Sequence, residues 1–310
     1  MNRRTMLAVL PAIGLAACGK SKSSKLKLAL NWKPDPQFGG FYAADYGKHG
    51  LDVEILPGGA GTPTVQMIGS AAADFGIVSA DELIVARSRG NDVVALFAVF
   101  QNCPQGIMAH ASRNLTSICD VVKGGTLALQ RGLPYARLLE KKCGFDKVKI
   151  VPSPGGDISV FLRDENFAQQ CFIMSEPLAA RRKGVAVKVF PVSDIGYNPY
   201  TTVLSCSGEM LKSKAEVARA MVAGVREGWS TYLDYPKATN ERMRQLNPSM
   251  DADTFAEVAE AQKPFIETAE TGRDDLGRMT AERWDTLARQ LKDLGDIPQA
   301  PPAAECFREL

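Results

Sequence analysis

From residue 25 onward the chain has short segments in which polar and apolar residues alternate, as in a β-strand with one buried face. Residues 25–31 and 51–56 show this pattern, and residues 39–46 between them suit a helix. Residues 93–100 are apolar without interruption, which predicts a strand buried on both faces. Helices are also expected at 64–70 and 80–89, with a short strand at 74–78. Strands that alternate with helices predict an α/β unit with a mostly parallel sheet.

The alternation starts again after Gly106 and predicts a second α/β lobe. Its expected strands are residues 126–129, 148–151, 171–173 and 186–190, and its expected helices are residues 134–142 and 157–164. From residue 214 the pattern is helical throughout, with candidate helices at 216–235, 252–259, 263–269 and 280–294. Regular structure is expected to end at the proline-rich residues 298–302.

The first residues have the layout of an export signal. Arg3 and Arg4 precede an apolar run that ends in Leu-Ala-Ala-Cys at residues 15–18, which resembles the lipobox of bacterial lipoproteins. The run is too short to cross a bilayer as a helix. We therefore expect residues 1–17 to be a cleaved signal peptide, Cys18 to carry the acyl chains of a membrane anchor, and residues 18–24 to form a tether. The arginine pair fits either general or twin-arginine export.

Composition and charge exclude several classes of partner. The 310 residues are 45% hydrophobic, enough for the cores of about two domains. Thirty-seven Lys and Arg against thirty-five Asp and Glu give a net charge of +2, so nucleic acid is not an expected partner. Of the seven cysteines, the six after Cys18 allow 15 pairings in an oxidising compartment. None forms a C-x-x-C pair and the two histidines lack ligand spacing, so we expect buried thiols, one or two disulfides and no metal site.

Polar and aromatic side chains follow the ends of four predicted strands. In chain order they are Asn31, Trp32 and Asp35, then Ser79 and Asp81, then Gln130 and Arg131, and finally Glu176. Ligands of open α/β sheets bind beyond the carboxyl ends of strands, so strand ends from two lobes predict a cleft between the lobes. Trp32 offers a flat face, Asp35 and Glu176 accept hydrogen bonds and Gln130 can do either, which suits a neutral or cationic heterocycle.

Several motifs also occur in a fixed order along the chain. LNWKPD at 30–35, GGFYAA at 39–44 and GLDV at 50–53 are followed by ADFGI at 73–77, PQG at 104–106, SEP at 175–177 and GYNPY at 196–200. Over about residues 25–235 the chain resembles the NMT1/THI5-like solute-binding proteins.

The resemblance implies an α/β fold of the type II periplasmic binding proteins, with two lobes and a ligand cleft at the hinge. Lobe 1 would comprise residues 25–107 and 204–310, and lobe 2 residues 108–203, with crossovers near Met108 and Val203. Members deliver thiamine-precursor pyrimidines, riboflavin, alkanesulfonates or nitrate to ABC importers, which implies a permease and its ATPase as partners. In pyrimidine-handling members an asparagine-tryptophan cluster lies beside the ring, and this cluster maps to Asn31 and Trp32. The acid of the second lobe maps to Glu176.

The same family has an enzymatic branch that makes the thiamine pyrimidine from its own histidine and pyridoxal phosphate. The cofactor lysine of that branch is replaced here by Val78, its sacrificial histidine by Glu82, and its cysteine-rich run by residues 197–201. The chain also lacks a P-loop, a nucleophile elbow and a zinc-protease motif. We therefore expect a binding protein without cofactor or catalytic residues.

The expected protein is a monomeric lipoprotein on the periplasmic face of the cell envelope. Its first-choice ligand is a pyrimidine-like heterocycle, on which Trp32, Tyr42 and Tyr197 would stack. Riboflavin, an alkanesulfonate or nitrate are the alternatives, and a small anion would depend on Arg131.

Overall fold

The structure is a computed structural model that describes residues 25–310. The signal peptide, Cys18 and the tether expected from the sequence lie outside the described residues. Within residues 25–310, every helix is too short or too polar to cross a lipid bilayer. In the same part of the chain, His, Cys, Asp and Glu side chains form no group of three or more that could hold a metal ion.

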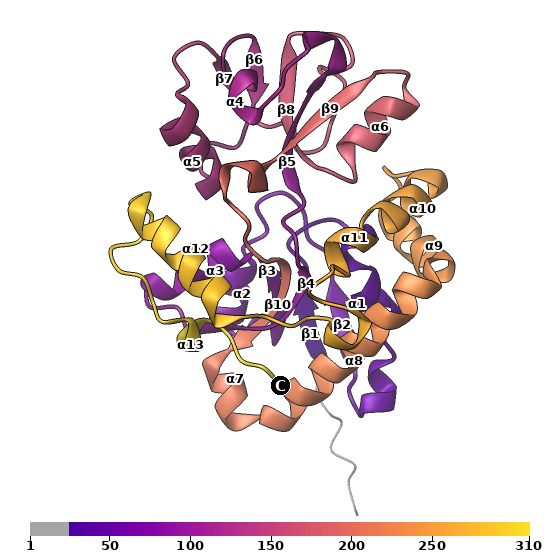
Figure 1. Cartoon of the computed structure of the whole chain (residues 1–310). Helices are drawn as coiled ribbons and strands as arrows, with labels where there is room; N and C mark the ends of the chain where they lie inside the picture. The colour runs from indigo at the N-terminus through magenta and orange to yellow at the C-terminus, as the bar shows by residue number, and fades with distance from the viewer. Residues whose placement is uncertain (1–24) are drawn as a thin grey trace, which may run out of the picture.

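Two five-stranded sheets form the centres of two lobes, one above the other in Figure 1. The lobe 1 sheet has the order β2-β1-β3-β10-β4 and consists of β1 (Leu26–Ala29), β2 (Val53–Leu56), β3 (Phe75–Val78), β4 (Val93–Phe100) and β10 (Thr201–Ser207). The lobe 2 sheet has the order β7-β6-β8-β5-β9 and consists of β5 (Gln105–His110), β6 (Thr126–Ala128), β7 (Lys149–Val151), β8 (Phe167–Phe172) and β9 (Val187–Pro191). The predicted α/β fold with two lobes is confirmed.

Both sheets are mostly parallel, as expected, with one reversed strand each. β10 runs antiparallel to β3 and β4, and β5 runs antiparallel to β8 and β9. These two strands enter directly from the other lobe, and the alternation of strands and helices did not predict them. The expected crossover positions Met108 and Val203 lie inside β5 and β10. The chain changes lobes a few residues earlier, at 101–104 and 192–200.

Helices cover both sides of the lobe 1 sheet (Figure 1). They are α1 (Gly39–Ala43), α2 (Thr64–Gly69), α3 (Ala80–Ser88), α7 (Gly208–Ser213), α8 (Ala215–Asp234), α9 (Pro236–Leu246), α10 (Ala252–Ala261), α11 (Lys263–Ile266), α12 (Ala281–Asp293) and α13 (Ala303–Cys306). The long α8 packs closely on α1 because α1 carries glycine there: a Cβ on Gly40 would lie 2.2 Å from the Trp229 ring. α13 follows the proline-rich residues, so the expectation that regular structure ends there was wrong.

Lobe 2 has fewer helices, namely α4 (Ile118–Val121), α5 (Pro134–Cys143) and α6 (Glu176–Arg182). The helix expected at residues 157–164 is wrong. Asp157 accepts from the Ser159 amide at 2.8 Å and Asp164 from the Asn166 amide at 2.9 Å. Such local bonds favour turns over a continued helix.

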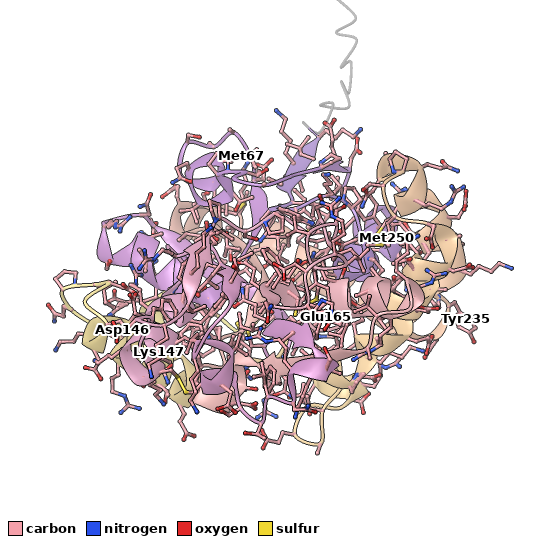
Figure 2. The ribbon with its side chains drawn as sticks, turned by 90° about the horizontal axis from the view of Figure 1, so that it is seen from above. Met67, Asp146, Lys147, Glu165, Tyr235 and Met250 are labelled. Atoms are coloured by element: carbon pink, nitrogen blue, oxygen red, sulfur yellow. A yellow bond between two sulfur atoms is a disulfide. The ribbon has the colours of Figure 1, made fainter. Side chains whose placement is uncertain are left out.

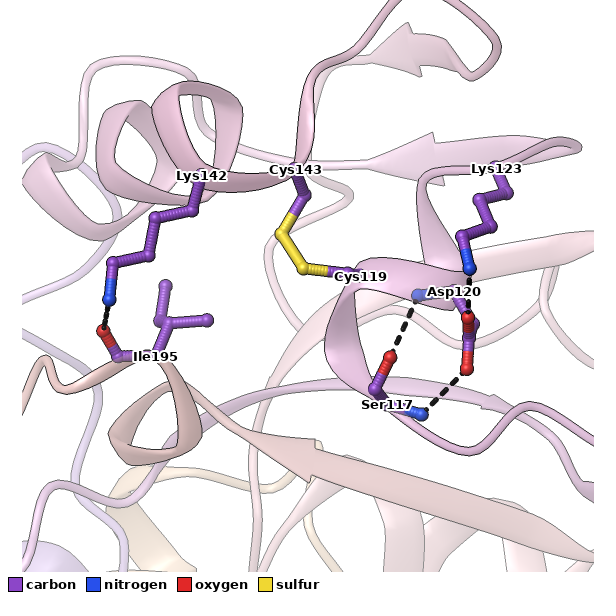
Figure 3. The surroundings of a disulfide bond; sticks show 7 residues. All are labelled: Ser117, Cys119, Asp120, Lys123, Lys142, Cys143 and Ile195. Carbon is purple, nitrogen blue, oxygen red and sulfur yellow. Dashed lines mark hydrogen bonds and ion pairs between the residues drawn. A yellow bond between two sulfur atoms is a disulfide. The ribbon is translucent and has the colours of Figure 1, made fainter.

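A disulfide joins Cys119 of α4 to Cys143 at the end of α5, on the flank of lobe 2 (Figure 3). Beside it, Lys142 Nζ donates to the Ile195 carbonyl at 2.8 Å and so ties α5 to the chain that leaves lobe 2. The thiols of Cys103, Cys171, Cys206 and Cys306 are buried and unpaired. The disulfide therefore stabilises lobe 2 on the side where the chain returns to lobe 1.

Candidate ligand site between the lobes

The two connections between the lobes are bonded to each other. The Cys103 amide in the first connection donates to Asn198 Oδ1 in the second at 2.7 Å. Arg283 of α12 donates to the Asn198 carbonyl at 2.9 Å, and its guanidinium lies 4.0 Å above the Tyr200 ring. Burial lowers the pKa of Arg283. These contacts tie the two connections of the hinge together, and the sequence did not predict them.

The loop after β1 brings Asn31, Trp32 and Asp35 to the carboxyl end of the lobe 1 sheet. The Gly58 amide donates to the Trp32 carbonyl at 3.0 Å, and a Cβ on Gly58 would lie 2.1 Å from the Leu30 carbonyl oxygen. Only glycine permits this approach. Asn31 Oδ1 is buried without a hydrogen-bond partner, so the loop presents an unsatisfied acceptor.

Asp35 is held by its neighbour Gln37. The carboxylate accepts from the Gln37 amide and from Gln37 Nε2, each at 3.0 Å. Gln37 Oε1 in turn accepts from the Thr202 hydroxyl at 3.4 Å, and Thr202 has a φ of 53° at the start of β10. A left-handed conformation at a β-branched residue is strained, and such strain gathers at functional sites. Burial raises the pKa of Asp35 to about 7 despite the bonds from Gln37.

Glu176 approaches from lobe 2, at the first residue of α6. Its Oε2 accepts from the Phe172 amide at 2.9 Å. Burial raises the pKa of Glu176 to about 7, the hydrogen bonds from its own amide and that of Phe172 oppose this, and the charge of Asp35 adds to it. Since Asp35 belongs to lobe 1, the two carboxyl groups interact across the boundary between the lobes.

Two consecutive glycines of lobe 2, Gly155 and Gly156, lie beside Trp32 and Glu176. A Cβ on Gly155 would lie 3.9 Å from Trp32 Cη2, and one on Gly156 would lie 3.6 Å from Glu176 Oε1. Trp32 of lobe 1 and Glu176 of lobe 2 therefore flank the same turn, which follows β7. Sequence reasoning missed this turn, although a Pro-Gly-Gly segment after a predicted strand was the available signal.

Ser79, Asp81 and Tyr197 form a buried network of their own. The Ser79 hydroxyl donates to Asp81 Oδ1, and the Tyr197 hydroxyl donates to Asp81 Oδ2 at 2.6 Å. Tyr197 is fully buried, and its ring centroid lies 6.5 Å from that of Tyr135 in α5. Burial and the nearby Asp81 charge raise the pKa of Tyr197 well above its usual value. The network links α3 of lobe 1 to the second hinge connection, and its members satisfy one another.

Removing the Tyr197 hydroxyl tests this structural role. In Tyr197→Phe, Asp81 Oδ2 loses its buried donor, so we expect the free energy of unfolding to fall by about 2 kcal/mol. Thermal unfolding of the purified protein measures the change. The matched control is Tyr235→Phe, because Tyr235 is 77% exposed at the outer edge of the molecule (Figure 2). Equal midpoints for the two variants would contradict the role of Tyr197.

The remaining predicted site residues lie further from this junction. Tyr42 is buried in α1 with an unpartnered hydroxyl, and Arg242 of α9 lies 5.3 Å from its ring. Gln130 and Arg131 are exposed after β6. Arg131 pairs with Glu140 at 3.2 Å, while the Gln130 amide donates to Gln170 Oε1 at 2.6 Å. Among the predicted residues, the structure therefore brings Trp32, Asp35 and Glu176 together most directly.

Two lobes, two crossovers and polar side chains at facing strand ends define a periplasmic binding protein fold. A solved structure shares it: the periplasmic aliphatic sulphonate binding protein SsuA from Escherichia coli, with a TM-score of 0.71, 14% identity and coverage of 92% of this chain and 93% of that one. The NMT1/THI5 like family model matches residues 35–239. The chain belongs to this family, as the motifs indicated.

Curated relatives of the chain include both binding proteins and an enzyme. A formylaminopyrimidine-binding protein of Halalkalibacterium halodurans is 23% identical, with 96% of this chain and 95% of that protein covered. The riboflavin-binding protein RibY of Chloroflexus aurantiacus is 22% identical, with coverage of 96% and 90%. A 4-amino-5-hydroxymethyl-2-methylpyrimidine phosphate synthase of Legionella pneumophila is 18% identical, with coverage of 93% and 92%.

Proposed function

We propose that this protein is the substrate-binding lipoprotein of an ABC importer and that it captures a small aromatic heterocycle, similar to a thiamine-precursor pyrimidine, between its lobes. The proposed ligand contacts are Asn31, Trp32, Asp35, Gln130 and Glu176. Ser79, Asp81 and Tyr197 would support the hinge, and Tyr42 would support the loop from within lobe 1. The observation that carries the proposal is the meeting of Trp32 and Glu176 at the Gly155–Gly156 turn.

The charges at this junction favour a ligand that donates hydrogen bonds. Two carboxyl groups with pKa values of about 7, one from each lobe, lie at this junction, and either can accept from a ring amino group when ionised. An anion such as a sulfonate or nitrate would be repelled by the ionised carboxylates. Arg131, which an anion would need, is occupied by Glu140. A riboflavin-sized ring system is the second candidate, because Trp32 can stack on either ring system.

The proposed partners follow from the importer role. Acyl chains on Cys18 would hold the protein at the periplasmic face of a membrane, close to a permease and its ATPase. One chain supplies both lobes and both crossovers, so a monomer suffices for capture.

A catalytic role like that of the pyrimidine synthases is not part of the proposal. Val78, at the end of β3 where that branch has its cofactor lysine, is fully buried and has no amino group. Glu82, in the position of the sacrificial histidine, has a carboxyl whose pKa is raised to about 7, first by desolvation and then by Asp81. Neither side chain can form an imine with pyridoxal phosphate.

A thermal-shift series tests the proposed ligand class. The purified protein is heated with formylaminopyrimidine, riboflavin, an alkanesulfonate or nitrate, each in large excess. We expect formylaminopyrimidine to raise the unfolding midpoint by several degrees, because a ligand that binds only the folded state stabilises it. A rise with the sulfonate or nitrate alone would overturn the ligand class and leave the importer role. No rise with any compound would contradict the proposed function.

A further inference from the structure

Arg182, at the last residue of α6 in lobe 2, lies against α10 of lobe 1 (Figure 1). Its Nη1 donates to Asp251 Oδ1 at 2.9 Å, and its Nη2 donates to Asp253 Oδ2 at 3.1 Å. Its Nε lies 3.8 Å from Glu257 Oε1, and the Thr254 hydroxyl accepts a further bond from the guanidinium. These acids raise the pKa of Arg182, the hydrogen bond to Asp251 most of all. One arginine of lobe 2 therefore faces three carboxylates of lobe 1.

This contact lies on the side of the molecule away from the hinge connections. On the other side, Lys141 of α5 donates to the Asp293 carbonyl of α12 at 3.0 Å. α12 is also bonded to the second connection, since Gln290 Nε2 donates to the Gly196 carbonyl at 2.7 Å. Figure 1 shows α5 and α12 on one side, with α6 and α10 on the other. A rotation about the connections that opens the cleft would therefore separate Arg182 from α10.

The residues next to α10 also hold the loop that carries Trp32 and Asp35. Asn247, before α10, donates through Nδ2 to the Pro34 carbonyl at 2.9 Å. Gln262, directly after α10, donates through Nε2 to the Pro36 carbonyl at 2.9 Å. Both side chains are buried. The residues of α10 and its two neighbours Asn247 and Gln262 all lie beyond residue 239, where the family match ends.

We propose that Arg182 and the acidic end of α10, formed by Asp251, Asp253 and Glu257, are an ionic latch that holds the cleft closed over a bound ligand. The proposal rests on the proposed function, because capture requires closure. The charges suit their positions, since Arg182 stabilises the C-terminus of α6, and Asp251 and Asp253 stabilise the N-terminus of α10. Arg182 is thus a positioning residue: it increases the closed fraction, and with it the apparent affinity, without touching the ligand.

Replacing Arg182 by glutamine tests the latch through dissociation kinetics. With formylaminopyrimidine as the probe, we expect about a fivefold faster dissociation and an unchanged association rate, because exposed ion pairs each contribute modestly. Arg182→Lys keeps a charge and is expected to restore part of the loss. The control is Arg181→Gln, because the Arg181 guanidinium donates to the Val187 carbonyl within lobe 2. An Arg182→Gln dissociation rate equal to that of the control would overturn the latch.

Solution scattering tests the latch without any ligand. We expect the radius of gyration of the wild-type protein to increase between about 50 mM and about 500 mM NaCl, because salt screens exposed ion pairs. Arg182→Gln should have a larger radius than the wild type at low salt, and the difference should shrink at high salt. If the probe fails to bind the wild-type protein, the proposed ligand is wrong and this measurement still decides the latch. Identical radii for wild type and variant at low salt would contradict it.

Discussion

Replacing Trp32 by alanine is expected to weaken heterocycle binding by about 100-fold or more. The ring lies beside Gly155 and packs on the lobe 1 core, so a ligand between the lobes would cover its remaining face. Covering about 100 Å² of aromatic surface contributes roughly 2.5 kcal/mol, and a stacked geometry adds up to about 1 kcal/mol. A total near 3 kcal/mol corresponds to about two decades in the dissociation constant. Isothermal titration with formylaminopyrimidine measures the change.

Arg131→Ala is the matched control for this measurement. Arg131 is exposed and paired with Glu140, so its removal should change heterocycle affinity by less than about twofold. The reverse result, a large loss for Arg131→Ala and a small one for Trp32→Ala, would identify an anion site and contradict the aromatic ligand. Both interpretations require that the Trp32→Ala protein is folded. Its unfolding midpoint establishes this independently of binding.

The sequence predicted best the elements whose pattern is uniform along their length. All eight residues of β4 are buried, and the apolar run at 93–100 has the same bounds as the strand. α8 and α12 each bury one face and expose the other, so periodicity placed their ends within about two residues. Propensity and burial agree in these elements, so the local sequence was sufficient to predict their type and their ends.

The reversed strands β5 and β10 show what local sequence cannot reveal. Each is hydrogen-bonded on both sides by partners distant in the sequence, and each directly follows a hinge connection. The local pattern of their residues therefore does not distinguish a strand from the connection that precedes it. The sequence did not predict α6 for a related reason. The helix begins at Glu176, which was interpreted as a polar residue at a strand end.

The candidate site was predicted in part by one rule of sheet topology. Because ligands bind beyond the carboxyl ends of strands, Trp32, Asp35 and Glu176 could be grouped from the sequence, and the structure brings them together. The same rule also selected Asp81, which instead bonds to Tyr197, a residue 116 positions away that was expected to stack on the ligand. A polar residue at a strand end can serve a ligand or another side chain. Only the fold distinguishes the two roles.

The carboxyl groups of Asp35 and Glu176 make the free energy of unfolding depend on pH in an unusual direction. The pKa of Asp35 rises from 3.8 to about 7, and that of Glu176 from 4.5 to about 7. Between about pH 4 and pH 7 the folded protein therefore holds more protons than the unfolded chain. The free energy of unfolding then falls as the pH rises through this range and levels off above pH 7. Because both groups are partly exposed to solvent, we expect a total fall of about 3 kcal/mol.

Urea unfolding at pH 5, 6, 7 and 8 (about one unit apart) measures this fall. The double variant Asp35→Asn with Glu176→Gln should remove the part that these two carboxyls contribute, while Glu82, whose pKa is also raised to about 7, keeps its own part. Some carboxyls have a pKa that is lowered by their partners, such as Asp120 beside Lys123 and Thr116. They make the free energy of unfolding rise with pH, but only at lower pH than this range. A wild-type profile that is flat from pH 5 to pH 8 would show that the two carboxyls are solvated as in water. The junction would then lack the desolvation on which selection of a hydrogen-bond-donating heterocycle depends.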